Sequence, residues 1–197
     1  MAKRIFDILI ASILLILMSP IIFLVALLVR CHLGSPIFFR QSRPGLDGTI
    51  FQIIKFRTMQ DITDQSGEEI ADSYRITRLG KFLRASSLDE LPELWNVIKG
   101  EMSMVGPRPL LTEYLPLYNE QQKRRHELKP GITGLTQIRG RNALEWKDKF
   151  DLDVWYVDNQ SLWLDIKILL LTVKKVLTQE GITSKGSVSA EKFKGND

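Results

Sequence analysis

The stretch ILIASILLILMSPIIFLVALLV, residues Ile8–Val29, runs for 22 residues without a charged side chain. As one straight helix it would be about 33 Å long, enough to cross a hydrocarbon core of roughly 30 Å. Lys3, Arg4 and Asp7 precede the stretch and Arg30 follows it. No small-x-small cleavage site comes after the apolar run, which disfavours a cleaved signal peptide. The sequence therefore predicts a membrane anchor.

The pair Ser19-Pro20 interrupts this stretch near its centre. Proline lacks a backbone N–H and clashes with the preceding turn, so it kinks or breaks a helix. A neighbouring serine hydroxyl can satisfy the carbonyl that the proline leaves without a donor. Because basic residues lie at both ends of the stretch, the positive-inside rule places neither end outside. Two topologies follow, a re-entrant hairpin with both ends at the cytoplasmic face and a kinked helix that spans the membrane.

The composition of the 197-residue chain excludes several classes of protein. With 44% hydrophobic residues the chain can bury a core, and its net charge of +4 is too small to indicate a nucleic-acid partner. Its one cysteine, Cys31, excludes an internal disulfide framework. His32 and His126 are the only histidines, so a zinc or iron site of the usual kind is not expected. A hard ion with oxygen ligands, such as magnesium, remains open.

The rest of the chain is expected to be mostly helical with one small β-hairpin, an α+β fold. Residues 36–41 and 49–57 are rich in Ile and Phe and flank the turn-forming run Pro44-Gly45-Leu46-Asp47-Gly48, which predicts the hairpin. The acidic stretch 60–74 is expected to be a loop. Helices are expected over 76–84, 91–98, 113–129, 143–157 and 162–177. We divide the chain into an anchor (1–32), a main domain (33–180) and a polar tail (181–197).

Two of these helices could lie at a membrane surface. The segment 143–157 interleaves four aromatic residues with charges, and 162–177 is strongly apolar with lysines at its polar positions. Aromatic residues beside lysine suit a helix in the headgroup region, although any one of these aromatic residues taken alone is better explained as part of the core. The four are Trp146, Phe150, Trp155 and Tyr156. The basic run 123–126 is expected to be a solvated face.

The most suggestive stretch for chemistry contains the adjacent carboxylates Asp89 and Glu90. Both could simply begin a helix. Ser87 and Glu90 match the S-x-x-E capping box, and Asp89, three residues before Pro92, would also make a good N-cap. Pro92 favours the later start because its missing N–H costs nothing in a first turn.

The surroundings of this pair favour a phosphate site. Arg84 precedes it, the turn Gly106-Pro107-Arg108-Pro109 follows, and two glycine-containing segments, Lys129–Leu135 and Gly140-Arg141-Asn142, come later. Arginine binds phosphate oxygens bidentately and glycine turns expose backbone N–H groups, so a diphosphate held with a divalent ion is indicated. The motifs of P-loop and Rossmann nucleotide sites, HExxH metalloproteases and GxSxG hydrolases are all missing from the sequence.

On the expected second strand, alternation places Lys55 and Arg57 on one face. These residues belong to the run Lys55-Phe56-Arg57-Thr58-Met59. Together with Ser87–Pro92, Pro107-Arg108-Pro109 and Pro130–Leu135, this run resembles the bacterial sugar transferase family. The resemblance is to the monotopic, PglC-like phosphoglycosyl transferases, and it extends from Ser19-Pro20 to about residue 180.

The resemblance implies an activity and a set of roles. A UDP-sugar, expected to carry an N-acetylated amino sugar such as diacetylbacillosamine, would give its sugar 1-phosphate to undecaprenyl phosphate and release UMP. Asp89 would be the nucleophile, Glu90 would assist it, and both would bind Mg²⁺. Ser19-Pro20 would form a re-entrant turn in the bacterial inner membrane, with residues 33–180 as the catalytic domain at its cytoplasmic face. The expected substrate-binding residues are Lys55, Arg57, Arg84, Pro107, Arg108, Pro109, Thr133 and Arg141.

Two alternatives to this interpretation remain. The first is a transferase that joins its two substrates directly, without an aspartyl intermediate. The second is a membrane-tethered interaction module without enzymatic activity, in which Asp89 and Glu90 only cap a helix.

Overall fold

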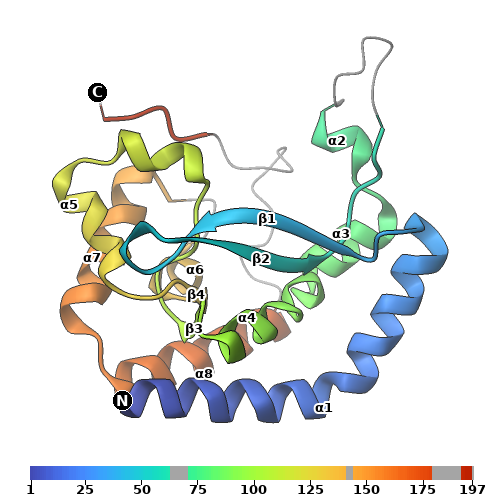
Figure 1. Cartoon of the computed structure of the whole chain (residues 1–197), viewed down its shortest axis with the longest axis horizontal. Coiled ribbons are helices and arrows are strands. Elements are labelled where there is room, and N and C mark those ends of the chain that lie inside the picture. The colour runs from blue at the N-terminus through green and yellow to red at the C-terminus, as the bar shows by residue number, and fades with distance from the viewer. Residues whose placement is uncertain (63–70, 141–143, 179–191, 197) are drawn as a thin grey trace.

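The computed structural model describes residues 1–62, 71–140, 144–178 and 192–196 (Figure 1). Helices packed around a small antiparallel sheet confirm the predicted α+β class. The helices are α1 (Ala2–Leu33), α2 (Asp72–Arg75), α3 (Arg78–Ala85), α4 (Glu93–Lys99), α5 (Glu120–Lys123), α6 (Leu135–Arg139), α7 (Trp146–Asn159) and α8 (Leu162–Thr178). The strands are β1 (Phe38–Pro44), β2 (Ile50–Phe56), β3 (Ser103–Val105) and β4 (Gly131–Thr133), and 3₁₀ turns span Leu46–Gly48, Leu88–Glu90, Thr112–Leu117 and Arg124–Glu127.

Helix α1 is 32 residues long and contains Pro20. Figure 1 shows that it runs along one side of the molecule and then turns sharply toward the hairpin. Proline cannot donate the hydrogen bond that the Ile16 carbonyl would accept in a regular helix. The Ser19 hydroxyl donates to that carbonyl instead, at 2.8 Å. The structure therefore confirms the predicted role of Ser19 beside the proline.

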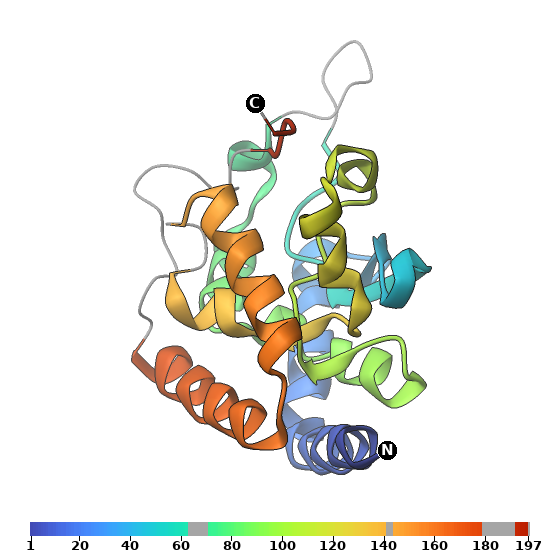
Figure 2. The same cartoon turned by 90° about the vertical axis from the view of Figure 1, so that its left-hand side faces the viewer.

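One side of the molecule is strongly apolar. The most apolar 18-residue window of α1 has a mean hydropathy of 3.0, and only 11% of it is buried. A helix in the core of a water-soluble protein would be mostly buried, so α1 has the length and exposure of a membrane helix. Helix α8 lies on the same side (Figures 1 and 2). Its exposed apolar residues are Leu162, Trp163, Ile166, Leu170, Leu171 and Val173.

Acidic and basic residues join the start of α1 to the main domain. Asp7 is 3% exposed, and its carboxylate accepts hydrogen bonds from the Ser103 hydroxyl at 2.9 Å and the Met104 N–H at 3.0 Å. Lys3 forms an ion pair of 2.7 Å with Asp165 of α8, which is fully buried. The charges that precede the apolar stretch therefore do more than flank a membrane segment, because they fix the anchor to the domain.

Arg4 connects α1 to the end of α4. Its guanidinium nitrogens donate to the carbonyls of Val97 and Ile98 at 2.6 and 2.7 Å. The last carbonyls of a helix have no partner within the helix and carry partial negative charge, so a cation stabilises them. Arg4 thus caps α4 from outside, and Gly100 ends that helix in the left-handed conformation.

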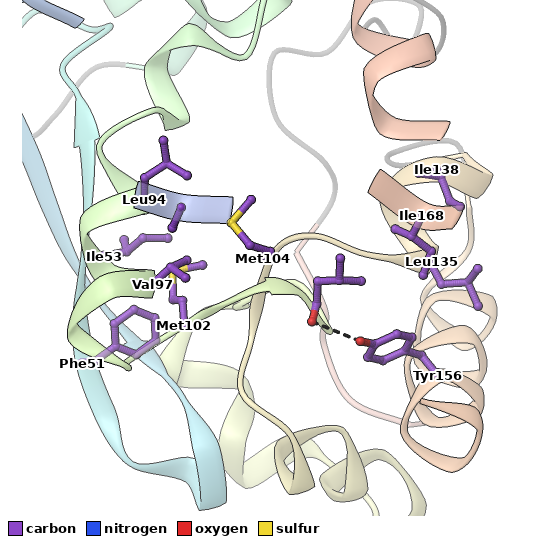
Figure 3. Packing of buried hydrophobic residues seen from close by; sticks show 12 residues of the cluster. Phe51, Ile53, Leu94, Val97, Met102, Met104, Leu135, Ile138, Tyr156 and Ile168 are labelled. Atoms are coloured by element: carbon purple, nitrogen blue, oxygen red, sulfur yellow. Dashed lines mark hydrogen bonds between the residues drawn. The ribbon is translucent and has the colours of Figure 1, made fainter. Parts of the chain in front are cut away.

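Strands β1 and β2 pair antiparallel from Phe38 opposite Phe56 to Pro44 opposite Ile50, which confirms the predicted hairpin. Its inner face contributes to the main hydrophobic core, which also receives side chains from α4, α6 and α8. Figure 3 shows the Tyr156 hydroxyl of α7 donating to the Val105 carbonyl at 3.1 Å across this core. The residues labelled around it are Phe51, Ile53, Leu94, Val97, Met102, Met104, Leu135, Ile138 and Ile168.

A second, parallel pair of short strands was not predicted. Ser103 pairs with Gly131 and Val105 pairs with Thr133. The segments meet so closely that a Cβ atom on Gly106 would lie 2.3 Å from the Lys129 carbonyl oxygen. The N–H of Gly106 donates to the Thr133 carbonyl at 2.9 Å, and that of Gly131 to the Pro107 carbonyl at 3.0 Å. These glycines permit close packing, and their N–H groups are not free for an anion.

The segment 113–129 also differs from the single helix that we expected. Pro116 lies within one 3₁₀ turn, and Asn119 begins α5 with a capping box to Gln122, so the segment folds as short turns. The prediction of a solvated face for the basic run is wrong for Arg125 and His126, which are 2% and 9% exposed. Their neighbours along the chain carry no apolar pattern that would have indicated this burial.

Most of the aromatic residues of α7 belong to the core, while Trp155 is 49% exposed. Phe150 and Tyr156 are buried, and Phe150 packs against Phe193. Phe193 is the buried residue of the described tail segment, 192–196. The end of the polar tail that the structure describes therefore packs on the domain.

Replacement of Asp7 tests the polar attachment of the anchor. We expect Asp7→Ala to lower the free energy of unfolding by about 2–3 kcal/mol, because it leaves the buried Ser103 hydroxyl and Met104 N–H without their acceptor. The exposed Asp151 of α7 supplies the control, and Asp151→Ala should change stability by no more than about 0.5 kcal/mol. Denaturant unfolding in detergent micelles measures both, and equal stability of the two variants would contradict the attachment.

Candidate active site

Asp89 and Glu90 lie on the 3₁₀ turn Leu88–Glu90, and neither caps a helix. Ser87 precedes the turn with φ 56°, a left-handed conformation that is uncommon for a residue with a side chain, and its hydroxyl makes no capping bond. Helix α4 begins later, at Glu93, and has no side-chain cap. Asp89 is 8% exposed, and among the residues that the structure describes its carboxylate has no hydrogen-bond or ion-pair partner. Both capping registers considered from the sequence are therefore absent.

Glu90 is held by cations from two distant parts of the chain. Lys55 of β2 lies 2.7 Å from Glu90 Oε1, and Arg108 donates to the same oxygen at 3.1 Å. Lys55 also lies 3.0 Å from Glu93, which is buried at the start of α4. The hairpin and the proline-flanked turn thus meet at the Glu90 carboxylate, and Lys55 links this carboxylate to α4.

This arrangement gives the carboxyl groups of Asp89, Glu90 and Glu93 different pKa values. Burial opposes the charge of Glu90, but Lys55 and Arg108 outweigh it and hold the pKa of Glu90 well below its usual range. Burial, helped by the charge of Glu90, raises the pKa of Asp89 to about 6 against the opposing effect of the nearby cations. Burial also raises the pKa of Glu93, to about 7. Near neutral pH, Glu90 is thus a fixed anion beside an Asp89 that is largely charged and unpaired.

Several predicted site residues gather here and others do not. Lys55 and Arg108 contact Glu90, while Arg84 lies near enough to lower the pKa of Asp89 and donates to the Thr58 hydroxyl at 3.0 Å. Arg57 instead donates to the Leu33 and Ser35 carbonyls at the end of α1 and pairs with Asp61. The hydroxyl of Thr133 lies 2.7 Å from that of Thr172 in α8. Pro107 and Pro109 flank Arg108 in a small hollow, and Arg141 lies outside the described residues.

Arg125, which we did not predict as a site residue, fixes the turn that carries Arg108. It donates to the Arg108 carbonyl at 2.7 Å and forms a buried ion pair of 2.6 Å with Asp153 of α7. The other Asp153 oxygen accepts from the Thr136 hydroxyl at 2.6 Å. Asp153 and Arg125 are 28 residues apart, and only the fold reveals that they pair. Glu93 was also missed, although its spacing of three from Glu90 across Pro92 was a signal.

The two adjacent carboxylates fit a magnesium ion that is shared with a substrate. Among the described residues, no three His, Cys, Asp or Glu side chains gather into a metal cage supplied by the protein alone. Magnesium is commonly held by one or two carboxylates together with substrate phosphates and water. Asp89 has no partner, and the second oxygen of Glu90 accepts no hydrogen bond within the described chain, so both could hold the ion.

Comparison with known proteins identifies the family of the chain. The family model described as "Bacterial sugar transferase" matches residues 1–179. The chain belongs to the bacterial sugar transferase family. The "Uncharacterized sugar transferase EpsL" of Bacillus subtilis is 56% identical over 194 residues, covering 98% of this chain and 96% of that protein. The "UDP-glucose:undecaprenyl-phosphate glucose-1-phosphate transferase" of Caulobacter vibrioides is 40% identical, over 90% and 70% of the two chains.

A third relative of this sugar transferase bears a different sugar in its name. The "Galactosyl transferase CpsE" of Streptococcus agalactiae is 44% identical, covering 75% of this chain and 36% of that protein. Family membership establishes an enzyme of the phosphoglycosyl transferase class, which excludes the alternative of a membrane-tethered module without enzymatic activity.

Replacement of Arg125 tests the support of the Arg108 turn. Lysine keeps the charge in Arg125→Lys but lacks the rigid fork with which Arg125 binds Asp153 through Nε and Nη2 while Nη2 also donates to the Arg108 carbonyl. A small displacement of a group that holds substrate can lower the rate about 100-fold, so we expect kcat/KM for the sugar donor to fall by about 10- to 100-fold.

Arg124→Lys is the matched control, since Arg124 pairs with Asp158 and Glu127 at the surface. It should leave kcat/KM within about twofold of the wild-type value. Release of UMP in the presence of lipid acceptor measures both variants. Equal kcat/KM in the two variants would show that Arg125 does not act on the site.

Proposed function

We propose that this enzyme transfers a sugar 1-phosphate from a UDP-sugar to undecaprenyl phosphate through a covalent phosphosugar ester on Asp89. The observation that carries the proposal is the Asp89 carboxylate, which has no partner among the described residues, beside a Glu90 whose charge Lys55 and Arg108 hold in place. A nucleophile must be free of competing protein side chains, while a fixed electrostatic environment lowers the barrier to attack.

The proposed reaction has two steps at one phosphorus atom. An oxygen of Asp89 attacks the phosphorus that bears the sugar, the bond from that phosphorus to the bridging oxygen breaks, and UMP leaves with this oxygen. A phosphate oxygen of the polyprenyl carrier then attacks the same phosphorus, which releases the Asp89 carboxylate and forms the diphosphate-linked sugar. Arg108 and Lys55 would stabilise negative charge that develops on the phosphates. Mg²⁺ bound by Asp89 and Glu90 would neutralise part of the diphosphate charge.

Several sugars are candidates for the group that the donor carries. We expected an N-acetylated amino sugar from the family resemblance, whereas the names of two relatives specify glucose and galactose. No described contact identifies a sugar pocket. A donor series therefore includes UDP-glucose, UDP-galactose and a UDP-linked diacetylated amino sugar.

The fate of Asp89 distinguishes covalent from direct transfer. With donor alone, we expect wild-type enzyme to release about one equivalent of UMP and to gain the mass of a phosphosugar on the Asp89 peptide. Asp89→Asn should fold normally, form no adduct and lose at least about 1,000-fold in turnover. Rapid-quench kinetics and peptide mass spectrometry across the donor series provide the measurement. Full turnover by a wild-type enzyme that never forms an adduct would favour direct transfer.

We further propose that α1 is re-entrant and that both of its ends lie at the cytoplasmic face of the inner membrane. This topology is supported by Pro20 within α1, by the sharp turn of that helix (Figure 1), by its exposed apolar surface, and by the basic contacts of Lys3 and Arg4 with the domain. The enzyme would then start the assembly of a lipid-linked polysaccharide or glycoconjugate, such as one used in protein glycosylation, where a cytosolic nucleotide sugar and a membrane lipid meet.

The single cysteine offers a test of this topology. Cys31 is exposed at the end of α1, and a variant with Cys31→Ser and Ala2→Cys places the thiol at its start. A membrane-impermeant maleimide should label both proteins in inverted vesicles and neither in intact spheroplasts. Labelling of the two positions from opposite sides would establish a spanning helix instead.

A further inference from the structure

The inner face of the hairpin carries a second cation besides Lys55. The register sets Phe39 opposite Lys55 and Arg43 opposite Phe51. Side chains of directly opposite residues point to the same side of a sheet, and alternate residues along a strand do so too. Arg43 therefore shares the face of the hairpin from which Lys55 reaches Glu90.

The donors of Arg43 are largely unused within the described chain. A guanidinium has five N–H donors, and Nη2 of Arg43 donates to Gln41 at 2.6 Å. The Nε atom is buried and has no hydrogen-bond partner in the part of the chain that the structure describes. No carboxylate among the described residues forms an ion pair with Arg43, whereas Lys55 has two. Buried polar groups in proteins are rarely left in this state, and anion sites are one of the places where they are.

The end of β1 that carries Arg43 lies against the turn that carries Arg108. Pro44, the next residue, lines the same small hollow as Pro107, Arg108 and Pro109. Burial and the like charge of Arg108 lower the pKa of Arg43 to about 10, against the opposing effect of Glu93. The charges of Arg43 and Arg108 thus oppose each other, and of these two arginines only Arg108 forms an ion pair with Glu90. An anion between them would reduce the repulsion and accept hydrogen bonds from the unused donors.

We propose that Arg43 and Arg108 form a two-arginine subsite for a phosphoryl group next to Glu90. This inference rests on the proposed phosphoglycosyl transfer and adds Arg43 to the residues that hold its substrates. The ligand is a phosphoryl oxyanion, and within this reaction it can come from the diphosphate of the nucleotide sugar or from the phosphate of the carrier lipid. Arg43 would hold it with the two-pronged geometry that guanidinium offers and lysine lacks.

The experiment compares Arg43→Gln with a matched control on the same strand. Arg40 lies on the opposite face of β1, is exposed and has no described polar partner, so Arg40→Gln removes the same charge away from the site. Inorganic pyrophosphate is the probe for binding, read as the rise in unfolding temperature of detergent-solubilised enzyme. We expect wild type and Arg40→Gln to be stabilised equally, and Arg43→Gln to need at least about 10-fold more pyrophosphate for the same shift.

Two kinetic measurements then identify the source of the phosphoryl group. If the subsite holds the donor, Arg43→Gln raises the half-saturating UDP-sugar concentration for UMP release in the absence of lipid by about 10- to 100-fold. If the subsite holds the carrier, that step is unchanged, and the half-saturating concentration of polyprenyl phosphate for discharge of the preformed adduct rises instead. Arg43→Lys preserves the charge, so its pyrophosphate affinity and its half-saturating substrate concentration should lie between those of wild type and Arg43→Gln. This variant takes the place of Arg43→Gln if the glutamine variant does not fold.

Pyrophosphate binding does not require covalent chemistry, so the two proposals can fail separately. Absence of an aspartyl adduct in wild type would remove the proposed mechanism and leave the subsite standing if Arg43→Gln still loses pyrophosphate binding. The subsite is refuted if folded Arg43→Gln matches Arg40→Gln in pyrophosphate stabilisation and in both kinetic steps. The same comparison is made with Arg43→Lys if only that variant folds.

Discussion

The structure depends on one carboxylate oxygen, Glu90 Oε1, that binds Lys55 and Arg108 together. Lys55 comes from the hairpin and Arg108 from the turn after β3, so the contact fixes two distant segments to the turn that carries Asp89. It also keeps Glu90 charged, and that charge, together with burial, raises the pKa of Asp89. Lys55 and Arg108, two of the cations near Asp89, pair with Glu90 instead, and the proposed nucleophile has no ion-pair partner among the described residues.

Helix α4 relates this site to the membrane side of the molecule. Its first residue, Glu93, lies against Lys55, and its last turn is capped by Arg4 from the start of α1. A helix of seven residues is only about 10 Å long. The carboxylates are therefore positioned relative to the apolar anchor by a short rigid element, which suits an enzyme whose second substrate is a lipid phosphate. The buried Asp7 strengthens the same attachment.

The sequence predicted the features that local patterns encode. The apolar anchor and the role of Ser19 follow from the chemistry of proline, and the hairpin follows from alternation around a turn of glycine and proline. Features that depend on contacts between distant residues were missed, such as the pairing of β3 with β4 and the buried ion pair of Arg125 with Asp153. Arg57 shows the limit of motif reasoning. It belongs to the same motif run as Lys55, but Arg57 contacts the end of α1 while Lys55 reaches the carboxylates.

The pH dependence of UMP release from donor alone tests the central claim most directly. The rate at low donor concentration reports ionisation of the free enzyme, and Asp89 must lose its proton before it can attack. A pKa of Asp89 raised to about 6 predicts that the rate is constant near neutral pH and falls about tenfold for each pH unit below that value. A rate that stays constant down to about pH 4, where an ordinary aspartate titrates, would contradict the proposed environment of Asp89.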